Sequence, residues 1–247
     1  GDRWSLLILR SVGLGARRYS EIRAVLDGIS DAVLSSRLKH LCEQSLLAQD
    51  LSMQSNHRYL LTPRSIDAVS IALAVWVWEK DWVPSAQSRS LRHLSCGRQC
   101  RPFVQCGHCK VKLHWTDTHA VAGPGAQFEK VPKGVARRMS HATLNDHDAH
   151  RLFAGESVEL LGDWWSMMIV VTIMQGRYRF SELQEVLGTP SQVLSDRLRR
   201  LVDSEILTPT LYQRHPARYE YVLTPKGDAL YPVMSMLSDW GARWLSG

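Results

Sequence analysis

An internal duplication constrains this chain more than any other feature: residues 1–83 are repeated in residues 162–245. The segments GDRWSLLILRSVGLGARRYSEIRAVL and GDWWSMMIVVTIMQGRYRFSELQEVL share eleven identical residues in 26 positions at an offset of 161. Farther along, AVLSSRLKHL matches QVLSDRLRRL at an offset of 160, and YLLTP matches YVLTP at 162. The offset changes only between matched segments, where loops tolerate insertions, so we predict two domains of the same fold.

Both copies open with a helix that is apolar on nearly all sides, at 4–12 and 164–174, which is the pattern of a buried helix. Glycine then ends it, because this residue readily adopts the left-handed conformation of a helix C-cap; the two glycines are Gly15 and Gly176. A short second helix follows, and its expected N-caps are Ser20 and Ser181.

The third helix of each copy, at 30–41 and 191–201, is predicted to be amphipathic. Its leucines recur at spacings of three and four residues, which puts them on one buried face: Leu34, Leu38 and Leu41, and Leu194, Leu198 and Leu201. Ser30 is the expected N-cap of the first of these helices. The opposite face is polar and is left for contacts outside the core.

A β-hairpin and a last helix complete each copy. Alternating residues in segments such as RYEYVLT predict paired strands, at roughly 46–51 with 57–62 and 206–213 with 218–224. Proline fits the first turn of a helix, so the last helix is expected to begin at Pro63 and at Pro225. Two tryptophans at a spacing of four residues end each of these helices: Trp78 and Trp82, and Trp240 and Trp244.

Three helices, a hairpin and a helix are the elements of a winged helix-turn-helix, whose third helix enters the major groove of DNA. We therefore predict a mainly α fold with small β-hairpin wings. Two winged helix-turn-helix domains at 1–83 and 150–247 are separated by a Cys-rich segment at 84–122 and a linker at 123–149. The Gly and Pro content of AGPGAQFEKVPKG indicates the linker.

Several motifs resemble the HxlR family of bacterial winged-helix transcription regulators. They are GDRWSLLILR, RRYSEI, GISDAVLSSRL and LTP in the first copy, and GDWWSMMIV, RFSEL, QVLSDRLRRL and HPARYEYVLTPKG in the second. The resemblance implies a regulator that binds double-stranded DNA in the bacterial cytoplasm, associated with the nucleoid, and it allows a small-molecule effector of unknown identity. Members usually have a helix before the GDRW-like motif. Residues 151–161 supply it in the second copy, whereas the first copy starts at Gly1 and is expected to be truncated.

Candidate DNA contacts lie on the third helices, on the wings and just before the second helices. Because glutamine pairs with adenine and arginine with guanine, we expect the second copy to be the better DNA reader. Its candidates are Ser191, Gln192, Ser195, Arg199 and Arg200 in the helix, Arg214, His215 and Arg218 in the wing, and Arg179. Those of the first copy are Ser35, Ser36 and Lys39, His57 and Arg58 in a shorter wing, and Arg18. The alternative is that these side chains form ordinary solvated surfaces.

Between the copies, four of the five cysteines fall within fourteen residues. A tight cluster of this kind favours a metal site in a reducing cytosol over disulfides spread along a chain. His93-x-x-Cys96 and Cys106-x-x-Cys109 form two chelating pairs, as in a structural tetrahedral zinc site. Thiolates favour zinc over magnesium or calcium. The expected ligands are Cys96, Cys106 and Cys109, with His93, Cys100 or His108 as the fourth. Free thiols or a redox-active disulfide are the alternatives.

The net charge of +6 comes from the middle of the chain, where residues 84–149 carry 10 Lys and Arg against 4 Asp and Glu. The charge therefore says little about the two copies. No apolar run approaches the ~20 residues of a membrane helix. No nucleophile elbow, P-loop, dinucleotide fingerprint or HExxH motif occurs, so we do not expect an enzyme. The alternative function is a protein-interaction scaffold that keeps the fold without sequence-specific DNA binding.

Two modules in one chain can imitate the dimer that single-module relatives form, with half-sites about 34 Å apart on DNA. Alternatively, the C-terminal helices pair two chains into a homodimer. The paired tryptophans fit either arrangement, as well as simple packing in the core.

Overall fold

The computed structural model describes residues 3–50, 57–84, 90–119 and 162–245, with Ser157 and Leu160. The predicted linker at 123–149, most of the predicted helix at 151–161 and the tip of the first wing lie outside these residues. Within the described part of the chain, no helix is long and apolar enough to cross a bilayer.

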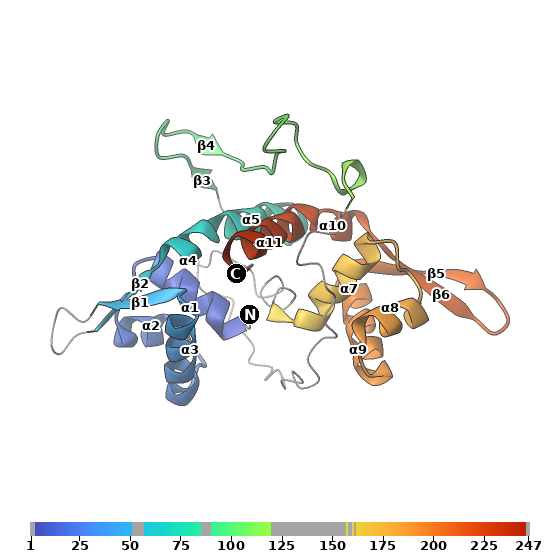
Figure 1. Cartoon of the computed structure of the whole chain (residues 1–247), viewed down its shortest axis with the longest axis horizontal. Helices are drawn as coiled ribbons and strands as arrows, with labels where there is room; N and C mark the ends of the chain where they lie inside the picture. The colour runs from blue at the N-terminus through green and yellow to red at the C-terminus, as the bar shows by residue number, and fades with distance from the viewer. Residues whose placement is uncertain are drawn as a thin grey trace.

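Each copy is mostly helical and carries one antiparallel hairpin, as in a winged helix-turn-helix (Figure 1). The first module consists of α1 (Arg3–Gly13), α2 (Tyr19–Val25), α3 (Asp31–Glu43), β1 (Leu47–Asp50), β2 (Arg58–Leu61), α4 (Pro63–Asp67) and α5 (Val69–Trp82). The second consists of α7 (Trp164–Met174), α8 (Phe180–Leu187), α9 (Ser191–Asp203), β5 (Leu207–Gln213), β6 (Arg218–Leu223), α10 (Pro225–Asp228) and α11 (Tyr231–Trp244). The described insert contains β3 (Leu91–Arg92), β4 (Gln99–Cys100) and a 3-10 turn at Trp115–Asp117.

The two wings pair in equivalent registers. Leu47 faces Leu61 in the first, and Leu207 faces Leu223 in the second. The strands of the second hairpin are longer and have a register shift after Leu211 (Figure 1).

The start of the second helix differs from the prediction. Ser20 and Ser181 lie inside the first turn, because α2 begins at Tyr19 and α8 at Phe180. The free N–H groups before each helix bond to a glutamate in its first turn, Glu21 or Glu182, so no serine cap is needed.

The last helix of each copy is broken in two, whereas the sequence predicted one helix. Proline begins the short first segment in both copies, as expected. The break falls at Ala68 and at Ala229–Leu230, where ψ is between −8° and −13°. In the second copy, Pro232 has no N–H to continue the helical bonding across the break.

The other predicted landmarks are found where the sequence placed them. Gly15 and Gly176 follow their helices with φ of +106° and +88°, and Ser30 accepts the N–H of Val33. The predicted leucine stripes are almost fully buried, and each lies in the core of its own module: Leu34, Leu38 and Leu41, and Leu194, Leu198 and Leu201.

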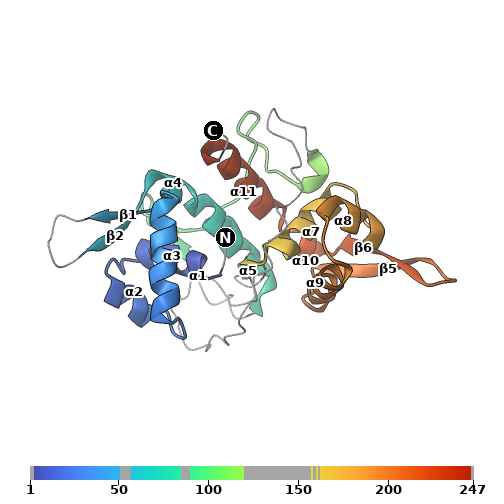
Figure 2. The same cartoon turned by 60° about the horizontal axis from the view of Figure 1, so that its bottom comes forward.

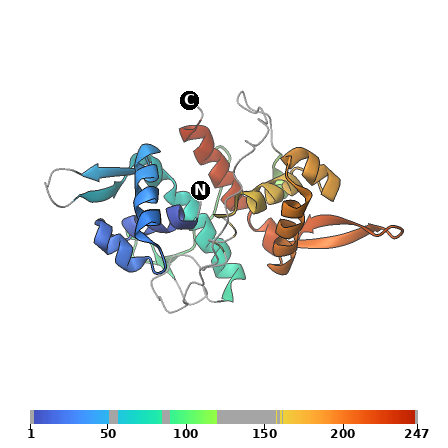
Figure 3. The same cartoon turned by 90° about the horizontal axis from the view of Figure 1, so that it is seen from below.

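The helices α5 and α11 pack against each other in the middle of the molecule (Figure 1). The wings point to opposite ends, while α3 and α9 lie on one side and the insert on the other. Rotated views show α3 and α9 in corresponding places to either side of this centre (Figures 2 and 3). The insert contacts both modules, since Arg101 pairs with Asp81 at the end of α5 and Thr118 bonds to Tyr231 of α11.

Candidate nucleic-acid interface

The third helix of the second module, α9, is fixed from behind by its leucines and by an ion pair. Arg197 lies 2.6 Å from Asp163, and both side chains are largely buried, at 17% and 10% exposure. Asp163 also accepts bonds from the backbone N–H and the hydroxyl of Ser166, which caps α7. The GDWWS motif therefore joins the first helix of the module to its third. This pair was not predicted from the sequence, although Asp163 and Arg197 both lie in the motifs that resemble the family.

A glutamate in the first turn of each second helix fixes the loop before that helix, which was also not predicted from the sequence. Glu182 accepts the N–H groups of Arg179 and Tyr178, both at 3.0 Å. Glu21 does the same in the first module, with distances of 2.8 and 3.0 Å. These donors hold the pKa of both glutamates below the usual range, because they stabilise the charged form. The repeated S-E pair, RYSEI and RFSEL, was the signal that could have revealed it.

The outer face of α9 presents polar side chains to solvent. Gln192, Arg199 and Arg200 are exposed, whereas Ser195 is half-buried. Asp196 holds two of these side chains, since the Gln192 amide donates to it at 3.3 Å and Arg199 lies 3.4 Å away. Ser191 at the start of the helix is exposed and accepts a bond from Gln184.

The second wing carries its predicted cations at its outer end. Arg214 and His215 lie in the turn between β5 and β6, and Arg218 begins β6. All three side chains are exposed. An exposed hairpin end with two guanidinium groups suits contact with phosphate oxygens or a minor groove.

Arg179 has a different environment from the one we predicted, because its charge is already matched. Its guanidinium lies 2.8 Å from Glu220 and 4.6 Å from the centre of the Tyr212 ring. Glu220 raises the pKa of Arg179, mainly through this hydrogen bond. The contact could not be predicted from the sequence, since Glu220 lies 41 positions away in a wing strand.

In the first module, the equivalent position brings two cations together. Arg58 stands where the second module has Glu220. Its backbone pairs with that of Arg18 in an antiparallel β-bridge at the base of the wing. Two acids lie nearby: Glu21, 3.7 Å from Arg18, and Asp50, the cross-strand partner of Arg58. The base of this wing therefore has an arginine where the second module has a glutamate.

The third helix of the first module has a shorter polar edge. Ser35, Ser36 and Lys39 are exposed, as is His57 at the start of the wing strand. Ser35 donates to the Tyr19 hydroxyl at 3.4 Å, and Lys39 lies 3.9 Å from Glu43. The predicted helix residues of this module are thus exposed, but they include one long cation where those of α9 include two.

Comparison with known proteins identifies the repeated unit. The sequence model of the HxlR-like helix-turn-helix family matches residues 1–87 and 160–247. The chain belongs to this HxlR-like family. An uncharacterized HTH-type transcriptional regulator of Mycobacterium bovis is 33% identical over 129 residues, which is 51% of this chain and 81% of that protein. The HTH-type transcriptional regulator YodB of Bacillus subtilis is 35% identical over 86 residues, 34% of this chain and 77% of YodB.

A solved structure, the reduced form of YodB, is 30% identical and covers 36% of this chain and 87% of that one, with a TM-score of 0.33. The two relatives found by sequence are matched over most of their own length, whereas the family model matches this chain twice. The present protein contains two HxlR-like units.

Between the HxlR-like units, the two predicted chelating pairs form two loops with the same backbone bonding. His93 N donates to Arg98 O at 2.9 Å, and Cys106 N donates to Val111 O at 2.8 Å, thirteen positions later. The return bonds also match, and the residue after the second ligand of each pair has positive φ, +69° at Gly97 and +62° at Lys110.

Each pair is close within its own loop, but the two pairs are not brought together. The His93 ring lies 3.3 Å from the sulfur of Cys96. Backbone N–H groups of Cys109 and His108 lower the pKa of Cys106. Among the residues that the structure describes, no three His, Cys, Asp or Glu side chains are grouped for a shared ion. Cys100 lies in β4 opposite Leu91, outside both loops.

Proposed function

We propose that this DNA-binding transcription regulator reads base edges with the outer faces of α9 and α3 and holds the DNA backbone with its wings. The observation that carries the proposal is the exposure of both third helices on one side of the molecule (Figure 3). Their leucines are buried, and Gln192 and Arg199 of α9 and Ser36 and Lys39 of α3 are exposed. Each helix has a wing beside it, as groove binding requires.

The side chains divide into two groups by their place. Gln192 and Arg199 lie on the helix, where their planar ends match the edges of adenine and guanine. Arg214 and Arg218 lie in the second wing, where they reach phosphates without reading sequence. In the first module, His57 and Arg58 of the shorter wing and Arg18 before α2 are assigned this role. Arg179 is assigned a smaller share, because Glu220 neutralises it.

The proposal is tested with duplexes selected by the protein from a random pool. Arg199→Ala should weaken binding by about 1–3 kcal/mol and relax the preference at one or two positions. Arg214→Ala should weaken binding to all duplexes about equally and reduce the salt dependence by about one counterion. Lys112→Ala, which removes an exposed charge from the insert, is the control. The absence of any enriched duplex, or equal behaviour of Arg199→Ala and Arg214→Ala, would contradict the assignment.

We also propose that the insert binds one zinc ion through His93, Cys96, Cys106 and Cys109. The support is the equal bonding of the two loops, each of which presents a pair of ligands at the spacing that one ion accepts. Bound zinc would hold the two loops together, and their own apolar residues are too few to do so.

Elemental analysis of protein prepared without chelator tests this site. About one zinc per chain is expected, and less than about half an ion would refute the proposal. Cys109→Ser should abolish stoichiometric zinc, while Cys100→Ser should retain it, because Cys100 lies outside both loops. Loss of zinc in Cys100→Ser but not in a His93→Ala variant would make Cys100 the fourth ligand instead.

A further inference from the structure

The contacts between the two modules come in equivalent pairs: a bond that the first module donates to the second is matched by one that the second donates to the first. Trp78 of α5 donates its indole N–H to the carbonyl of Lys226 at 2.9 Å, and Trp240 of α11 donates to the carbonyl of Arg64 at 2.9 Å. Residues 226 and 64 occupy the same position in their copies, as do 240 and 78. We call this contact between α4–α5 and α10–α11 the seam. It has the form of a two-fold dimer interface within one chain.

Cation–π contacts between the modules come in an equivalent pair too, and apolar side chains pack beside them. The Lys226 ammonium lies 5.7 Å from the centre of the Trp78 ring, and the Arg64 guanidinium lies 5.3 Å from that of Trp240. Ala74 and Val75 of α5 form a buried cluster with Val233 of α11. Trp78 also packs into the core of the second module. The modules are therefore joined by packed contacts as well as by the polypeptide.

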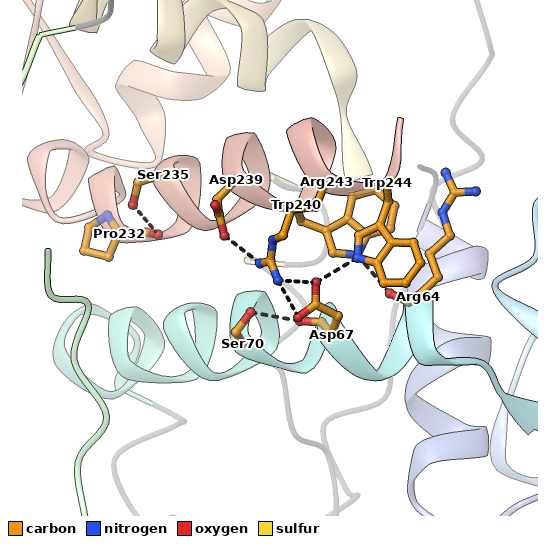
Figure 4. A network of polar contacts seen from close by, with 9 residues as sticks. All are labelled: Arg64, Asp67, Ser70, Pro232, Ser235, Asp239, Trp240, Arg243 and Trp244. Atoms are coloured by element: carbon orange, nitrogen blue, oxygen red, sulfur yellow. Dashed lines mark hydrogen bonds and ion pairs between the residues drawn. The ribbon is translucent and has the colours of Figure 1, made fainter. Parts of the chain in front are cut away.

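One group of polar contacts breaks the symmetry (Figure 4). Asp67 of α4 accepts the indole N–H of Trp244 at 2.8 Å and pairs with Arg243 at 2.8 Å. The positions that correspond to Asp67 and Arg243 in the other copies are Ala229 and Asp81. The exchanged contact is therefore absent, and Asp81 pairs with Arg101 of the insert instead.

This difference favours the pairing of unlike modules. Two first modules would place Asp67 opposite Asp81, so like charges would repel. Two second modules would place Arg243 opposite Ala229, so Arg243 would lose the contact that Asp67 provides and keep only Asp239 of its own helix. Only a first module with a second one makes the Asp67 contacts, and within one chain the partner is present at the millimolar effective concentration of a tethered segment.

We propose that one chain is a complete DNA-reading unit, which binds as a monomer to an asymmetric duplex with two unlike half-sites. The inference rests on the proposed function. Relatives with one module need two chains to present two third helices, whereas the seam supplies the second helix from the same chain. The half-sites lie about 34 Å apart, one turn of DNA.

The chemistry of the two helices makes the half-sites different. The α9 half offers an amide and two guanidinium groups, which pair with adenine and guanine edges. The α3 half offers two hydroxyls and one ammonium beside the cations at the base of its wing. No single sequence satisfies both, so an inverted repeat is a poorer ligand than an asymmetric site.

The mass of the protein–DNA complex tests the inference, with a duplex enriched by the full chain from a random pool. Native mass spectrometry should give one chain per duplex, and one chain free in solution. Asp67→Arg, which faces Arg243, should lower the affinity about tenfold by loosening the seam. Arg243→Asp in the same chain should restore it to within about threefold. Asp117→Arg, an equal change of charge on the insert, is the control.

The outcomes separate the inference from the function on which it rests. A chain that is monomeric but enriches no duplex would refute DNA binding and leave the seam intact. Two chains per duplex on an inverted repeat would confirm DNA binding and overturn the inference. A swapped pair, with α5 of one chain on α11 of another, would appear as two chains free in solution and would also overturn it. Failure of the Arg243→Asp rescue would remove the role assigned to Asp67.

Discussion

The two modules agree in their cores and differ at their edges. Leucines, caps and the tryptophans of the seam recur at matching positions, because each must fill the same space or satisfy the same backbone group. The residues that face outward have diverged. Glu220 neutralises Arg179 in the second module, whereas Arg58 adds a second cation beside Arg18 in the first. The comparison shows which positions the fold dictates and which are free to differ between the modules.

The largest expected effect concerns the ion pair behind α9. Asp163→Ala leaves the buried Arg197 without its partner and removes the cap of α7, so the free energy of unfolding of the second module should fall by about 3 kcal/mol. Urea denaturation followed by tryptophan fluorescence measures it. Asp203→Ala, at the far end of α9, is the control. A loss below about 1 kcal/mol would show that the leucines alone hold α9.

A smaller loss of stability is expected at the position where the first module has Ser65 and the second has Gly227. A Cβ at Gly227 would lie 2.3 Å from the carbonyl oxygen of Ile206, which is backbone and cannot move freely. Gly227→Ala should therefore cost about 2 kcal/mol, and Ser65→Ala at the same place in the first module about 1 kcal/mol, for its lost hydrogen bonds. Thermal unfolding of the two variants compares them. A Gly227→Ala variant as stable as the native chain would mean that the close approach of α10 to Ile206 relaxes without cost.

The two tryptophans of the seam should differ by their burial. Trp78 is 3% exposed, whereas Trp240 is half-buried. Replacing either by Phe removes the N–H donor, and the carbonyl left behind is shielded from water only in the first case. We expect a loss of about 1–2 kcal/mol for Trp78→Phe and less than about 1 kcal/mol for Trp240→Phe, measured by urea unfolding. A larger loss for Trp240→Phe than for Trp78→Phe would contradict this expectation.

The smallest effect is a pH dependence of the asymmetric contact. The bond from Trp244, with help from Arg243, lowers the pKa of Asp67 below its usual value of about 3.9. A lowered folded pKa adds stability above the ordinary value, and this is lost as the pH falls through the folded one. Asp67→Asn should thus unfold at a lower temperature than the native chain at pH 7, and the difference should vanish in strong acid. A difference between Asp67→Asn and the native chain that persists unchanged in strong acid would contradict this expectation.

The sequence was sufficient for the fold because the duplication supplied each pattern twice. Leucine spacing, Thr-Pro and the glycines predicted elements whose causes are local. The break at Ala68 and the partner of Arg179 were not predictable, since both depend on contacts between distant segments. The seam illustrates the same limit. Trp78 and Trp240 were visible at equal spacing, but only the structure pairs each with a carbonyl of the other module. The two ligand loops of the insert are recognisable from spacing, and the ion that joins them remains a proposal.

Binding to symmetrised duplexes tests the central claim most directly. The enriched duplex is compared with two derivatives, in each of which one half-site is replaced by an inverted copy of the other. Two unlike modules on one chain predict that the original binds more tightly than both derivatives, by about tenfold or more. Equal or tighter binding to either inverted repeat would contradict the account, because it would mean that both third helices accept one sequence or that two chains share the site.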